Sequence, residues 1–112
     1  MINLLLVLLL LTGSVSNEHG RIGIRVFGSG EVIHVYSHSP ANTYGIQEGD
    51  FIESADGEKG SKQVTGSPGT KVRLEIIRKG KTIWLDVPRV PDKEINDKED
   101  PENFEFYSVQ GC

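Results

Sequence analysis

Apolar and polar residues alternate along three short segments in the first half of the chain, which predicts three β-strands there. In residues 21–27, the apolar side chains of Ile22, Ile24 and Val26 fall on one face. Residues 31–37 are rich in β-branched and aromatic side chains, and residues 51–55 carry the third pattern. We therefore expect a small fold made mostly of antiparallel strands.

The clearest pattern lies at residues 71–88, around a turn at Lys79-Gly80. Apolar residues would lie opposite apolar residues on one face of this hairpin, and the other face would match opposite charges, as a half-buried antiparallel pair requires. The inner pairs are Ile76 with Ile83, Leu74 with Leu85, and Val72 with Val87, and the outer pairs are Arg73 with Asp86 and Glu75 with Trp84.

A one-turn helix is predicted over residues 40–44, before the third strand. Ser39 can cap it, and Pro40 suits the first helical position, where its missing N–H costs nothing. Gly45 can adopt the left-handed conformation that ends a short helix. Residues 58–69 contain three glycines and one proline, so this interval has room for one helical turn at most.

The first residues are expected to be a secretory signal. Residues 4–11 form an unbroken apolar run of eight, and Ser14 and Ser16 supply the small residues of a cleavage site. A run of that length is too short to cross a bilayer, which takes about twenty residues. We therefore predict that residues 1–16 are a signal peptide. The alternative is an uncleaved tether, which would then be the chain's membrane contact.

Charge divides the remainder into two segments. Residues 17–90 carry ten basic and nine acidic residues, whereas residues 91–112 carry two lysines and seven acids. A near-neutral core has no basic surface for a phosphate backbone, so no nucleic acid is expected as a partner. The charged residues 91–103 lack periodicity, which predicts a largely disordered acidic tail over 91–112.

An aromatic segment at residues 104–109 interrupts this tail, with Phe104, Phe106 and Tyr107 close together. We expect it to dock, either on a partner or on this domain, where it would add a strand beside residues 24–27 and compete with a ligand. Cys112 is the chain's one cysteine, so no internal disulfide can form. Its thiol is either exposed and unpaired or, in an oxidising compartment, links two copies as a dimer or forms a mixed disulfide.

Catalytic chemistry finds little support in the sequence. His34 and His38 are four residues apart, but on a strand that spacing is roughly 13 Å, too far for one metal ion to bridge. No serine lies in a G-x-S-x-G setting, and Gly28-Ser29-Gly30 lacks the lysine and helix of a phosphate loop. The chain is therefore expected not to be an enzyme and to use no metal or cofactor.

Four motifs together resemble a PDZ domain. They are Arg21-Ile22-Gly23-Ile24, the S-P-A-x-x-x-G-I-x-x-G-D-x-I string at residues 39–52, the Asp56-Gly57 turn, and G-x-x-G-T-x-V-x-L at residues 66–74 followed by R-x-G-K at 78–81. Their order is similar to the bacterial, circularly permuted type that accompanies Htr-like and C-terminal processing proteases, here without a protease domain. The resemblance implies a mainly β (α+β) barrel or sandwich over residues 20–90, with a shortened or missing second helix.

The same resemblance implies where a peptide would bind. Backbone N–H groups of the loop around Gly23 would hold a terminal carboxylate, with Arg21 or Arg25 adding positive charge, and an extended peptide would pair with the following strand. The implied peptide-binding residues are Arg21, Ile22, Gly23, Ile24, Arg25, Val26 and Val64. The alternative is that Ile22 and Ile24 are core residues and Gly23 is a bulge.

Two functions remain open at this point. The first is a non-catalytic periplasmic or secreted module that binds peptide or protein C-termini, or a protein surface, as an adaptor or regulator of an envelope protease. The second is a structural or assembly protein that uses the PDZ-like fold as a scaffold and binds no terminus.

Overall fold

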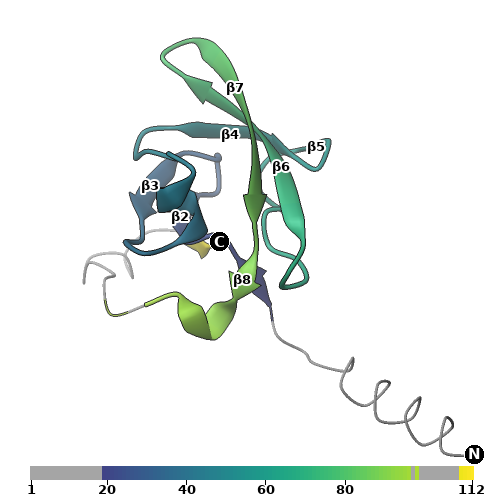
Figure 1. The fold of residues 1–112 in the computed structure, drawn as a ribbon. Helices are drawn as coiled ribbons and strands as arrows, with labels where there is room; N and C mark the ends of the chain where they lie inside the picture. Colours follow the sequence, from purple (N-terminus) through teal and green to yellow (C-terminus); the bar gives the residue numbers. More distant parts are fainter. Residues whose placement is uncertain (1–18, 97, 99–108) are drawn as a thin grey trace, which may run out of the picture.

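The computed structural model describes residues 19–96, 98 and 109–112, and within these ranges the chain folds into three small antiparallel sheets (Figure 1). The largest has the order β5-β4-β6-β7, with β4 at Phe51–Ala55, β5 at Glu58–Lys59, β6 at Lys71–Arg78 and β7 at Lys81–Pro88. The second has the order β3-β2-β9, with β2 at Ile24–Phe27, β3 at Val32–Val35 and β9 at Val109–Gly111. The third pairs β1, Gly20–Arg21, with β8, Val90–Pro91.

The hairpin of β6 and β7 has the predicted register. Leu74 lies opposite Leu85, and Arg73 lies opposite Asp86. Leu74 is fully buried, whereas Trp84 on the other face is half exposed. The expected fold class, a small, mainly antiparallel α+β structure with one short helix, is thereby confirmed.

The short helix α2, Pro40–Thr43, also forms where it was predicted. The Ser39 hydroxyl accepts a hydrogen bond from the Asn42 N–H at 3.2 Å and donates one to the Tyr36 carbonyl at 2.7 Å. Gly45 follows with a φ of +85°, the conformation that ends the helix. Beyond it, the buried Asp50 carboxylate accepts two hydrogen bonds from Arg78, at 2.7 and 2.8 Å, which ties the helix-to-strand turn to the end of β6.

One hydrophobic core lies between the sheets. Ile52, Leu74 and Ile76 enter it from the large sheet, and Ile24 and Val26 enter it from β2. Each of these side chains is fully buried. Since Val64 from the loop after β5 joins the same cluster, this core continues beneath the site described below.

The structure corrects the expectation that the tail is disordered from residue 91. Val90–Pro91 pairs with β1, a short 3-10 helix, η1, follows at Asp92–Glu94, and Ile95 is buried. The Asp92 N–H also bonds to the His19 carbonyl at 2.9 Å. The predicted signal and the aromatic residues 104–108 lie outside the described part of the chain. Within that part, no helix is long and apolar enough to span a membrane.

Candidate peptide-binding groove

The loop between β1 and β2 is shaped by Gly23. Its φ is +94°, and a Cβ at this position would lie 2.2 Å from the Ser39 Cβ, so only glycine fits. The Ile22 carbonyl accepts a hydrogen bond from the Ala41 N–H at 2.8 Å, and the Gly23 carbonyl accepts one from the Tyr36 N–H at 3.0 Å. These bonds fix the loop to α2 and to the end of β3, and its own N–H groups face the opposite way.

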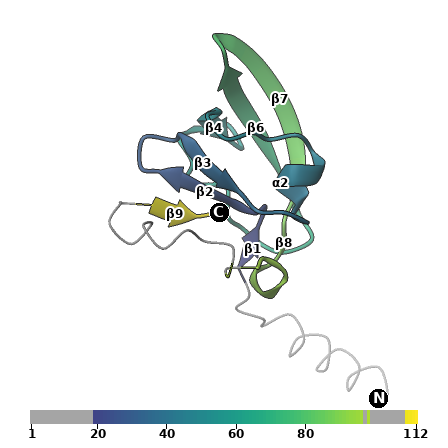
Figure 2. The same ribbon diagram turned by 90° about the vertical axis from the view of Figure 1, so that its left-hand side faces the viewer.

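Residues 109–112 of the same chain occupy the groove onto which these N–H groups open. Strand β9 pairs antiparallel with β2, with Gln110 opposite Val26 and Gly111 opposite Arg25 (Figure 2). The main-chain oxygen of Cys112 accepts hydrogen bonds from the N–H groups of Ile22 at 2.6 Å and Gly23 at 3.1 Å. The Cys112 N–H donates to the Ile24 carbonyl at 2.7 Å. This is β-strand addition, with a main-chain oxygen held in the loop around Gly23.

The Cys112 side chain points into the core. It is 3% exposed and packs within the hydrophobic cluster, so the expectation of an exposed thiol is wrong. Burial raises its pKa to about 11, an effect that the positive charges of Arg21 and Arg25 partly oppose. While docked, the thiol is therefore protonated at neutral pH and shielded from oxidants and from another copy's thiol.

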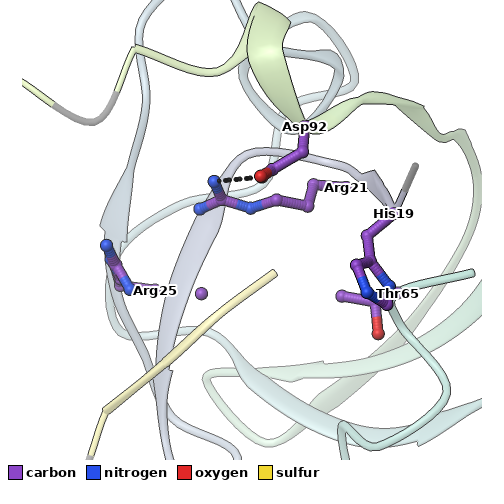
Figure 3. Close-up of a pocket in the computed structure, with 6 residues that line it drawn as sticks. His19, Arg21, Arg25, Thr65 and Asp92 are labelled. Carbon is purple, nitrogen blue, oxygen red and sulfur yellow. Dashed lines mark hydrogen bonds and ion pairs between the residues drawn. The ribbon is translucent and has the colours of Figure 1, made fainter. Parts of the chain in front are cut away.

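Two arginines flank the docked segment. Arg21 is almost fully buried, donates to the Asp92 carboxylate at 2.8 Å, and lies 5.5 Å from the centre of the Tyr36 ring. Arg25 donates through Nε to the Tyr36 hydroxyl at 2.7 Å. Both arginines border a pocket of about 440 Å³, in which Arg21 reaches across toward Arg25 (Figure 3). The other residues that line this pocket are His19, Thr65, Asp92 and Gly111.

The loop at residues 61–65 supplies the other wall of the site, and no helix forms there. The buried Arg89 holds this loop, donating to the carbonyls of Val64 at 2.9 Å and Gln63 at 2.8 Å, and to the Asp56 carboxylate at 3.0 Å. A hydrogen bond from the Arg73 N–H, with another from Arg89, keeps the pKa of Asp56 below its usual value. The position of Val64 therefore depends on one arginine rather than on a helix.

The structure gathers the predicted site residues in one place, but divides their roles. The side chains of Ile22, Ile24, Val26 and Val64 are fully buried in the core, as the alternative interpretation held for Ile22 and Ile24. The main chain of Ile22, Gly23 and Ile24 bonds to Cys112, and Val26 pairs with β9, whereas the main chain of Val64 bonds to Ser61 and Arg89. Gly23 is a loop residue with a required left-handed backbone rather than a bulge within a strand.

Sequence reasoning missed three residues of the site: Tyr36, Arg89 and Asp92. Tyr36 is fully buried, which alternation alone could suggest, but its contact with two arginines could not be foreseen. Arg89 and Asp92 carried no local signal, since each acts on residues far away in the sequence. His34 lies on β3, opposite Arg25 of β2, and packs edge-on against Tyr36. Among the described residues, no group of three potential ligands could hold a metal ion.

Comparison with known proteins finds similar folds among solved structures. No protein-family profile matches the sequence, and no curated protein matches it. Among solved structures, a serine endoprotease from Yersinia pestis matches 66% of this chain with a TM-score of 0.58 and 28% identity, over 29% of its own length. The HtrA-type protease AlgW with a decapeptide matches 66% of this chain, with a TM-score of 0.57 and 23% identity, over 30% of its length.

A photosystem II D1 C-terminal processing protease matches 77% of this chain with a TM-score of 0.58 and 19% identity, over 26% of its length. The chain thus spans about a third or less of these proteins, and the matching parts are their PDZ regions. No protease domain lies within the described residues. With the motifs at Gly23, Ser39 and Asp56 in place, the chain has the fold of the PDZ regions of HtrA-type and C-terminal processing proteases.

Proposed function

We propose that this chain is a non-catalytic binding module that takes the carboxyl-terminal residues of a peptide or protein into the groove between β2 and the loop at residues 61–65. The observation that carries this proposal is the position of residues 109–112. They pair with β2, and two N–H groups of the loop around Gly23 converge on the main-chain oxygen of Cys112. In a peptide that ended at this residue, those donors would face a carboxylate.

The surroundings suit an anion. The guanidinium groups of Arg21 and Arg25 are near enough to Cys112 to act on its pKa, so a bound carboxylate would lie in a positive field. The apolar cluster beneath the groove would receive the side chain of the last residue, as it receives that of Cys112. One of the solved structures of similar fold, the protease AlgW, is described with a decapeptide.

The chain's own segment at residues 109–112 acts in this proposal as an internal competitor. A ligand from outside must displace β9 from the edge of β2, so the apparent affinity is lower than that of the open groove. The aromatic segment at residues 104–109 predicts strand addition at this edge, whereas the described strand β9 begins at Val109.

The test is an NMR titration of the full chain with two hexapeptides that have the sequence of residues 107–112. One carries a free terminal carboxylate and the other a terminal amide. We expect the free acid to shift the amide signals of residues 22–27 and to bind at least about tenfold more tightly, because hydrogen bonds to a charged group contribute about 1.5–3 kcal/mol. Equal affinities, or shifts elsewhere on the domain, would contradict terminus binding and favour the scaffold function.

We further propose that the protein works outside the cytoplasm, in the periplasm or after secretion, as an adaptor or regulator of an envelope protease. The signal-like residues 1–16 and the fold shared with such proteases support this location. Intact-mass measurement of the exported protein is expected to give a chain beginning near Asn17, and retention of residues 1–16 would oppose the proposal. A dimer through Cys112 requires that residues 109–112 first leave the groove.

A further inference from the structure

Gly111, the penultimate residue of the docked segment, lies beside the guanidinium groups of Arg21 and Arg25. Gly111 lies directly opposite Arg25 in the pairing of β9 with β2, and side chains of directly opposed residues share a face of the sheet. A Cβ added to Gly111 would lie 2.8 Å from Nη1 of Arg25 and 3.0 Å from Nη2 of Arg21. Because Gly111 does not have a positive φ, an ordinary L-residue can take its backbone conformation.

Both guanidinium groups are held in place by the domain. The Tyr36 hydroxyl accepts from Nε of Arg25, and Asp92 accepts from Nη1 of Arg21. The atoms nearest to the Gly111 position, Nη1 of Arg25 and Nη2 of Arg21, are different from those in these two bonds. The side chain of Arg21 is 8% exposed and that of Asp92 is 55% exposed, so the Asp92 carboxylate is on the solvent side of the arginine.

A pocket lies next to Gly111, and the ends of the two arginine side chains must shift slightly to admit a Cβ there. The pocket of about 440 Å³ borders Gly111, both arginines, Thr65 and His19. Among the described residues that line it, Asp92 is the acidic one. A side chain longer than a methyl group could enter this pocket from the residue that pairs with Arg25.

We propose that the groove selects partners whose penultimate residue is aspartate or glutamate. This proposal rests on the proposed function and names the class of ligand that the groove takes. The new carboxylate would meet two pre-positioned guanidinium groups, one of them largely desolvated, where planar N–H forks match its two oxygens. A lysine there would be repelled, and an alanine would displace the guanidinium groups without compensation. The chain's own Gly111 has no side chain with which to make this contact, so an acidic partner displaces residues 109–112 more readily than a copy of them would.

The test uses the full chain, under reducing conditions, and four hexapeptides with the sequence of residues 107–112 and Gly, Ala, Glu or Lys in the penultimate place. The internal competitor is the same for all four, so it cancels from the affinity ratios. We expect the Glu peptide to bind about five- to tenfold more tightly than the Ala peptide, and the Lys peptide to bind more weakly, given the energies of opposed charge pairs on a sheet. The Glu preference should shrink with added salt.

Charge reversal supplies the matched control. In an Arg25→Glu variant, the Lys peptide is expected to bind better than the Glu peptide, and Arg25→Gln should lie between that variant and the natural chain. Equal affinity of the Glu and Ala peptides for the natural chain would overturn the proposal. So would a Glu preference that survives Arg25→Glu.

If none of the peptides binds, that result counts against the proposed function alone. A second measurement then tests the preference for an acidic penultimate residue. Cys112 is the chain's one thiol and is buried when docked, so its alkylation rate reports how often residues 109–112 leave the groove. This rate is divided by the alkylation rate of a free peptide with the same four terminal residues. Relative to Gly111→Ala, Gly111→Glu is expected to slow this normalised rate about fivefold and Gly111→Lys to raise it. Equal rates in the Glu and Lys variants would overturn the proposal independently of any added peptide.

Discussion

Gly23 couples the groove to the short helix. Its Cα approaches Ser39, the residue that caps α2, and the helix in turn holds the Ile22 carbonyl through the Ala41 N–H. The direction in which the loop presents its N–H groups therefore depends on a glycine, a helix cap and one backbone bond. A change at any of the three would move the donors that face Cys112.

Gly23→Val should abolish peptide binding, and the structure locates the cause in the collision with Ser39 and the positive φ. Since both effects also strain the fold, we expect the free energy of unfolding to fall by more than about 2 kcal/mol. Thermal unfolding, measured beside the peptide titration, checks both effects. A folded Gly23→Val variant with unchanged affinity would place the binding site elsewhere.

The Cys112 thiol makes docking of residues 109–112 depend on pH. Its pKa is raised by burial to about 11 in the docked state, against 9.0 for an ordinary thiol. Docking should therefore be fully favoured below pH 9 and should weaken as the pH rises toward 11, by on the order of tenfold or more. The apparent affinity of a peptide ending in alanine should rise over this range in the natural chain, and much less in Cys112→Ser. An equal rise in both would assign the effect to other groups.

Among the elements, the hairpin of β6 and β7 contributes most clearly to stability, because one of its faces is buried and the other is not. Leu74 is fully buried opposite Leu85, whereas Thr82 is exposed near the turn. Leu74→Ala is expected to lower the free energy of unfolding by about 2–4 kcal/mol, and Thr82→Ala by well under about 1 kcal/mol. Denaturant unfolding of the two variants checks this, and comparable losses would contradict the register.

The loop at residues 61–65 depends on Arg89 in place of a second helix. Arg89→Lys keeps the charge but cannot reproduce the separate bonds to Val64, Gln63 and Asp56. We expect a loss of about 1–3 kcal/mol in stability and faster amide exchange at Val64. Unchanged exchange at Val64 would show that the loop holds its shape without the arginine.

These elements also show how far local patterns carry a prediction. The hairpin and α2 were predictable because their signals, alternation about a turn and a Ser-Pro cap, lie within a few residues of what they determine. The order of residues 91–95 and the burial of Cys112 were not, because each depends on pairing with a strand about seventy or more residues earlier. Arg89 was missed for the same reason, since its partners Val64 and Asp56 lie 25 and 33 residues earlier in the chain.

On the scale of the whole molecule, the chain carries both a groove and a segment that fills it. Residues 109–112 complete the sheet beside β2 and add Cys112 to the core, so the docked chain leaves no free edge on that side of β2. In the proposed binding module, residues 109–112 fill the groove unless a ligand of higher affinity displaces them. The preference proposed for an acidic penultimate residue gives such a ligand an advantage that the chain's own Gly111 lacks.

The central claim is that one groove binds either residues 109–112 or an external carboxyl terminus. The most direct measurement compares the affinity of the free-acid hexapeptide for the full chain and for a chain lacking residues 109–112. Gln110→Pro, which removes an N–H from β9, serves as a full-length second variant. If the tethered segment competes at an effective concentration near the millimolar range, its removal should tighten binding on the order of tenfold or more, with the shifts still at residues 22–27. Equal affinity for the full-length chain and both variants would contradict the claim.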